Sequence, residues 1–259
     1  MRTVLSKIEF NKLIHIKNIV TYIYSFILVL VLGILSLVLS INDTSKIVAV
    51  LWLFIFIITV RGYLNEQFEN TINDFLIEKL DIDAYDYCIV KEIHLPIIGN
   101  RKYFNTRKKI LLAYTQMLRG NFQLSLQQLE KLEPNCFSKK KYSILKQQAF
   151  YLILINKILL EDPKVFNTTL LSTEIGNNYK EKLQAIYDIF ILSKPNNYFD
   201  ETIGKNKLEN IEIKYYKALN TKLRNDINYI KTFEEVAKKD SKLFYVSFAK
   251  KQLIAVERD

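Results

Sequence analysis

The chain is poor in the residues that interrupt regular secondary structure. Its 259 residues include only 6 glycines and 4 prolines, whereas folds rich in strands need many turns built from these residues. This scarcity favours long helices and predicts an all-α fold. Lysine, asparagine, isoleucine, tyrosine and phenylalanine are abundant instead, a composition that resembles translation from the AT-rich genome of a low-GC bacterium.

Cysteine and histidine are equally scarce. The two cysteines, Cys88 and Cys136, lack paired spacing, so we expect reduced thiols and no structural disulfide. His15 and His94 do not stand at ligand spacing either, so we expect no metal site. Nucleophile-elbow, phosphate-loop and metalloprotease motifs are absent from the sequence. We therefore expect no cofactor and no enzymatic activity.

Two apolar runs dominate the N-terminal quarter. The first, Ile19–Ser40, carries no charge and as a helix would span roughly 33 Å, enough to cross a hydrocarbon core. The second, Ile47–Val60, is only about 21 Å long but extends to Leu64 if Arg61 snorkels to the headgroups. The pair predicts a two-span membrane hairpin, with the second helix continuing into the cytosol.

Charge sets the expected topology of this hairpin. Four cations and one acid precede the first run, while the connecting loop has one lysine and one aspartate. The positive-inside rule then places both termini in the cytosol. Small residues in the first run, including Gly33 and Ser36, predict close packing of the two spans and also allow homo-oligomerisation.

An acidic stretch and a basic stretch follow the hairpin. Residues 64–86 carry seven acidic side chains and one lysine, on a helical pattern. Residues 91–146 reverse this balance, and three interpretations stay open: a solvated face, an intramolecular partner for the acidic helix, or a surface for anionic lipid. No nucleic-acid motif accompanies the charge, which argues against that partner. The cations that we assign to this basic patch are Arg101, Lys102, Lys108, Lys109, Lys139, Lys140 and Lys141.

The rest of the chain repeats itself. An alanine recurs inside successive apolar helical windows at spacings of 36, 36, 33 and 31 residues, and most windows are followed by a turn and a second amphipathic helix. A helix pair of this length cannot bury its apolar face alone, so neighbouring pairs must stack, and a small residue fits where helices cross closely. The five alanines are Ala113, Ala149, Ala185, Ala218 and Ala249.

The best-matching unit combines Leu112-Ala113, the turn Gly120-Asn121-Phe122, Ser125, Leu129 and Leu132. This order of large, small, turn, aromatic, small and large residues resembles the tetratricopeptide repeat (TPR) family. Lys109 and Gln116 stand where that family has large apolar residues. The resemblance implies an α-solenoid that binds a peptide or protein on its concave face. Carried over by position, the groove residues would be Arg107, Ile110, Tyr114 and Met117.

These patterns divide the chain into four parts. They are a basic cytosolic flank (1–18), a transmembrane hairpin (19–64), an acidic juxtamembrane helix with a connector (65–104) and a TPR-like domain (105–259). We expect a membrane-anchored scaffold that binds a protein or peptide partner at the inner leaflet. Two other functions stay open: a peptide sensor or immunity-type factor, and an accessory subunit of a membrane enzyme or exporter.

Overall fold

The chain is all-helical wherever its structure is described. The computed structural model describes residues 10–40, 44–91, 101–132, 137, 142–160, 177–239 and 242–256. These residues form two units, Met1–Phe75 with Val90–Leu95 and Leu76–Ile89 with Pro96–Asp259. The helices are α2 (Phe10–Ser40), α3 (Thr44–Ile77), α4 (Ile82–Val90), α5 (Arg101–Leu118), α6 (Phe122–Glu130), α7 (Ser143–Leu159), α9 (Asn177–Phe190), α10 (Tyr198–Glu201), α11 (Lys207–Leu223), α12 (Asn228–Ala237) and α13 (Phe244–Val256).

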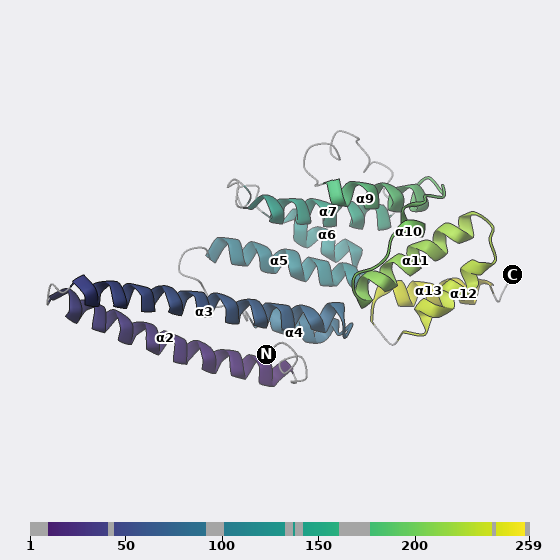
Figure 1. The fold of residues 1–259 in the computed structure, drawn as a ribbon. Helices are drawn as coiled ribbons and strands as arrows, with labels where there is room; N and C mark the ends of the chain where they lie inside the picture. Colours follow the sequence, from purple (N-terminus) through teal and green to yellow (C-terminus); the bar gives the residue numbers. More distant parts are fainter. Residues whose placement is uncertain are drawn as a thin grey trace. The chain divides into compact units, whose positions relative to one another are not determined.

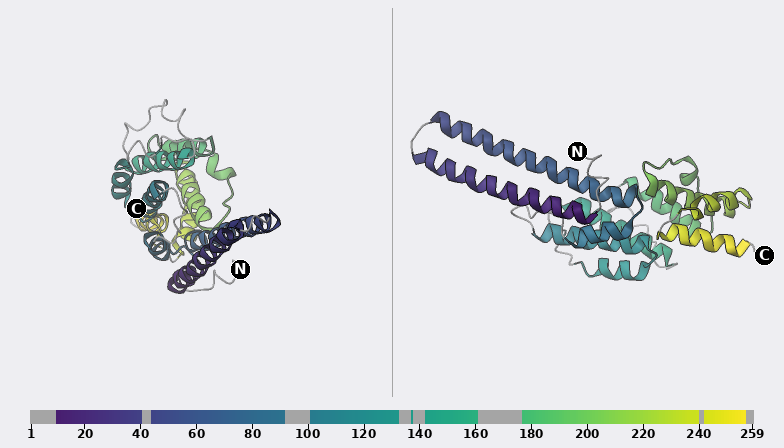
Figure 2. Two further views of the ribbon diagram at one scale, coloured as in Figure 1. Left: turned by 90° about the vertical axis from the view of Figure 1, so that its left-hand side faces the viewer. Right: turned by 90° about the horizontal axis from the view of Figure 1, so that it is seen from below.

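The first unit is built on two long apolar helices. α2 and α3 lie side by side and run in opposite directions (Figures 1 and 2). A small core of Tyr24, Val31, Val50 and Ile57 joins them, and the Tyr24 hydroxyl donates a hydrogen bond to the Ile57 carbonyl oxygen. Both helices are long and apolar enough to cross a membrane.

α3 passes without interruption from the apolar run through Arg61 into the acidic stretch, as the sequence predicts. It ends at Ile77, three residues before the predicted end at Leu80. Leu80 adopts a left-handed backbone conformation with φ of 60°, which an α-helix cannot continue. The Asp81 carboxylate then accepts a hydrogen bond from the Ala84 amide at 2.9 Å and so starts α4.

The second unit stacks helices in chain order. α5 packs on α6 and α7, α7 on α9, and α11 on α12 and α13. The five recurrent alanines lie within α5, α7, α9, α11 and α13, and each is at most 2% exposed. All five alanines therefore lie on buried faces of their helices.

Two turns within this stack have the same geometry. Gly120 (φ 83°) and Asn225 (φ 58°) each stand seven residues after a repeat alanine and end their helices in a left-handed conformation. After α5, the Asn121 amide donates to the Gln116 carbonyl oxygen, and after α11 the Asp226 amide donates to that of Thr221. Two of the sequence windows thus end in turns of the same backbone geometry.

The third pair departs from the predicted pattern. The sequence predicts its second helix over 198–203, but α10 is a single turn that ends at Glu201, and Ile203 is 85% exposed. Polar contacts replace apolar packing here. The buried Asn220 side chain accepts a hydrogen bond from the Asn196 amide at 2.8 Å and donates one to the Asn196 carbonyl oxygen at 2.9 Å. The second helix predicted over 164–171 lies outside the described residues.

Candidate functional site

The interior of the second unit brings together one polar or aromatic side chain from each alanine-bearing helix. The Lys182 ammonium on α9 lies 2.7 Å from a Glu212 carboxylate oxygen on α11, and these side chains are 19% and 12% exposed. The ammonium also lies 6.0 Å from the centre of the Tyr151 ring on α7. Tyr114 on α5 and Tyr245 on α13 are close enough to the ion pair for their pKa values to respond to Glu212.

Aromatic rings fill the rest of this interior. Tyr216 stacks on Phe199 with ring centres 4.8 Å apart, and Tyr245 lies edge-on to Tyr216 at 5.9 Å. Tyr215 contacts both Phe233 and Phe244 at 6.1 Å. The part of a helical stack that would form an open groove is therefore occupied by the protein's own side chains.

Burial and the ion pair determine the protonation states of this cluster. Burial raises the pKa of Tyr151, Tyr215 and Tyr245, so their phenols stay protonated at neutral pH. Burial is the largest single effect on Lys182 and opposes its charge, but the attraction and hydrogen bond of Glu212 together with Tyr151 and Tyr114 outweigh it, so the Lys182 pKa is raised.

A second network joins the first and last alanine-bearing helices. Phe122, at the start of α6, lies edge-on to Phe244 at 5.1 Å, so α13 comes back to the α5–α6 turn. Arg119 at the end of α5 binds Asp83 at 2.8 Å and also Asp86, while Lys242 binds Asp83. Sequence periodicity predicts an open stack and gives no sign of this return.

The network also bears on the basic stretch. Arg119 belongs to that stretch and pairs with Asp83 and Asp86 on α4. The hydrogen bonds from Lys242 and Arg119 hold the Asp83 pKa below its usual range. Cys88 on α4 is buried, whereas Cys136 lies outside the described residues.

The four predicted groove residues fall in different environments. Ile110 and Met117 are each 2% exposed, which makes them core side chains that present no surface to a partner. Tyr114 is half-buried beside the Lys182–Glu212 pair, and Arg107 is half-buried on α5. Ile110 and Met117 therefore belong to the protein's own core, and Tyr114 belongs to its polar cluster.

The predicted basic patch is partly described. Lys102 and Lys109 are exposed on α5, and Lys108 beside them is half-buried. Arg101 is the first residue of α5, and Lys139–Lys141 lie outside the described residues. α5 thus carries exposed positive charge away from its buried face.

A surface pocket that sequence reasoning missed lies at the ends of α9 and α11. Its volume is about 390 Å³, within the range of small-ligand pockets. Apolar side chains form most of it, and three polar ones complete it. The lining residues are Ile189, Phe190, Leu219, Lys222, Leu223, Asn225 and Gln252.

These features define an all-helical protein with two helices long and apolar enough to cross a membrane and a stack of helices with a charged, aromatic interior. The chain matches no family model, no curated protein and no solved structure.

Proposed function

We propose that the chain is a two-pass membrane-anchored scaffold whose TPR-like stack binds a protein partner at the inner leaflet. The observation that carries the anchor is the exposed apolar surface of α2 and α3. Tyr22, Phe26 and Trp52 are 76%, 69% and 67% exposed, and most of their neighbours are equally apolar. In water such a surface would drive aggregation, whereas in a bilayer it faces hydrocarbon.

The partner surface in this proposal is the outer side of the stack. The interior is filled by side chains such as Tyr114 and by the Lys182–Glu212 pair, so a partner contacts the exposed residues instead. The exposed cations Lys102 and Lys109 on α5 favour an acidic protein segment or anionic lipid as the ligand of that side. Holding the partner at the membrane raises its local concentration without any chemistry.

Protease protection tests the anchor and its orientation. Digestion of intact cells should spare the C-terminal stack, and digestion of broken cells should degrade it. Degradation from outside intact cells would refute the orientation. Extraction of the full chain by alkaline carbonate, without detergent, would refute the anchor itself.

Photo-crosslinking tests the partner surface. A crosslinking amino acid at Lys109 should trap a partner in native membranes, whereas one at Met117, 2% exposed on the same helix, should trap none. A stoichiometric polytopic membrane protein among the adducts would favour the accessory-subunit function instead. Equal yields at the two positions would contradict an outward-facing site.

The pocket at the ends of α9 and α11 favours the peptide sensor as a second candidate. Its apolar part, which includes Phe190 and Leu219, suits one large apolar side chain of a short peptide. Binding of a free peptide library to the full chain in nanodiscs tests this function. Leu219→Arg should abolish binding if the pocket is used and leave it unchanged if it is not.

A further inference from the structure

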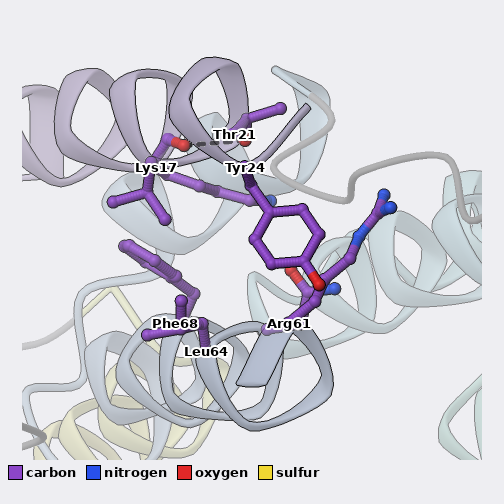
Figure 3. Close-up of a pocket in the computed structure, with 8 residues that line it drawn as sticks. Lys17, Thr21, Tyr24, Arg61, Leu64 and Phe68 are labelled. Atoms are coloured by element: carbon purple, nitrogen blue, oxygen red, sulfur yellow. Dashed lines mark hydrogen bonds between the residues drawn. The ribbon is translucent and has the colours of Figure 1, made fainter. Parts of the chain in front are cut away.

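A second pocket lies between α2 and α3, at the end where both apolar runs meet charge. Figure 3 shows its residues, which come from both helices. It encloses only about 10 Å³, room for about one water molecule. Two of its lining residues are cations and none is an acid. They are Lys17, Val20, Thr21, Tyr24, Arg61, Leu64, Asn65 and Phe68.

Arg61 lies close to the charge-free run of α2. Its guanidinium carbon lies 5.4 Å from the centre of the Tyr24 ring, and the Tyr24 hydroxyl bonds the Ile57 carbonyl oxygen one turn earlier on α3. Tyr24 lies inside the charge-free run of α2. The Arg61 side chain passes beside the Tyr24 ring, as Figure 3 shows, so its guanidinium can reach beyond the charge-free run.

The charge of Arg61 is not neutralised within the part of the chain that the structure describes. No carboxylate pairs with it there, and its Nε–H is buried without a hydrogen-bond acceptor. A buried donor without an acceptor and a cation without an anion both cost free energy at a low dielectric. Lys17, which is 5% exposed, adds a second positive charge to the same pocket.

The surroundings identify the missing anion. Tyr22 and Tyr63 are exposed on α2 and α3 at the same end as Arg61, and tyrosines gather at the membrane–water interface. The anion at that depth is the phosphate of a lipid headgroup. A guanidinium binds phosphate with two parallel hydrogen bonds, and the uncompensated charge of Arg61 favours a headgroup with net negative charge.

We propose that Arg61, with Asn65 beside it, binds the headgroup phosphate of an anionic phospholipid at the cytosolic end of the α2–α3 pair. The proposal rests on the membrane anchoring proposed above and adds the lipid class and the residues that select it. The cavity is too small for a phosphate, so the headgroup sits at its mouth, on the guanidinium.

Native mass spectrometry of the full chain tests this site. The protein in detergent receives phosphatidylglycerol and phosphatidylcholine at equal concentration, and the ratio of retained lipids is measured. Wild type should retain phosphatidylglycerol preferentially, and Arg61→Gln should lower this preference about fivefold, the factor for one cation at an anionic surface. Asn65→Asp, which adds an acid to the pocket and leaves Arg61 in place, should lower it as well.

Lys12→Gln is the matched control, because Lys12 is exposed on α2 and does not line the pocket. An equal loss in Lys12→Gln and Arg61→Gln, or no loss in either pocket variant, would overturn the site. Complete displacement of phosphatidylglycerol by inorganic phosphate would show a free-anion site and overturn the lipid assignment. Flotation with liposomes separates the two proposals: wild type that fails to float refutes the anchor, whereas floating without lipid preference refutes only the headgroup site.

Discussion

The Lys182–Glu212 pair makes the sharpest prediction about stability. At 2.7 Å and an effective dielectric constant of about 20, its attraction is about 6 kcal/mol before the desolvation of both charges is subtracted. Removal of one partner leaves the other charge almost buried and alone. Lys182→Met should therefore lower the free energy of unfolding by about 3 kcal/mol, the lower end for buried pairs, because both side chains keep some solvent contact.

Replacing both charges should restore most of this loss. Lys182→Met combined with Glu212→Leu removes the uncompensated charge and fills the space with apolar atoms, so the double variant should unfold within about 1 kcal/mol of wild type. The assay is denaturant unfolding of the full chain in detergent, followed by near-ultraviolet circular dichroism of the buried tyrosines.

An exposed pair supplies the control for this cycle. Lys214 and Glu235 are 2.6 Å apart, but their side chains are 49% and 44% exposed. Lys214→Met should therefore cost about 0.5 kcal/mol or less. The reasoning fails if Lys182→Met and Lys214→Met cost the same, or if the Lys182/Glu212 double variant is as unstable as the two single losses added together.

Three further predictions concern the second unit. Gly120→Ala should lower the free energy of unfolding by about 1–2 kcal/mol, because φ is 83° and the new Cβ would lie 3.2 Å from that of Phe244. Asn225→Gly, at the equivalent turn, should not destabilise the fold. Equal effects of the two substitutions on thermal unfolding would contradict this reasoning. The raised pKa values of Tyr151, Tyr215 and Tyr245 mean that the fold favours the protonated phenols, so this contribution to stability should be complete below about pH 10 and fall above it. Tyrosinate absorbance should therefore rise together with unfolding. Separate transitions in absorbance and unfolding would refute the coupling. The lowered pKa of Asp83 means that its ion pairs contribute stability above about pH 4, and that this contribution is lost as pH falls further. In Asp83→Asn, the unfolding midpoint should therefore fall less steeply with decreasing pH than in wild type. An unchanged decrease would exclude Asp83 as its source.

The features that depend on local sequence could be predicted. A helix needs only neighbouring residues to set its period, so the alanine windows gave the correct helices around Ala113, Ala149 and Ala218. The continuation of α3 through Arg61 followed from the change of an apolar run into an amphipathic one without an intervening proline. Gly120 marked its turn because glycine tolerates a positive φ.

Features that depend on long-range contacts could not be predicted. Lys182 and Glu212 look like any of the other charged residues on two amphipathic helices, and only the packing angle turns them toward each other. The same limit explains Ile110 and Met117, which were assigned to a groove on the premise of an open stack. The pocket around Arg61 depends on which face of α2 meets α3, a choice that two almost uniformly apolar helices leave open.

The return of α13 to the α5–α6 turn also restricts how the proposed scaffold works. An open solenoid changes its curvature to fit a partner, but here Phe122 on Phe244 and Asp83 between Arg119 and Lys242 join the first and last alanine-bearing helices. Opening the interior would separate these contacts and expose the tyrosines around Lys182, at a cost in buried apolar area. A partner that binds the exposed residues of α5 avoids that cost. The proposed scaffold therefore presents a preformed outer surface to its partner.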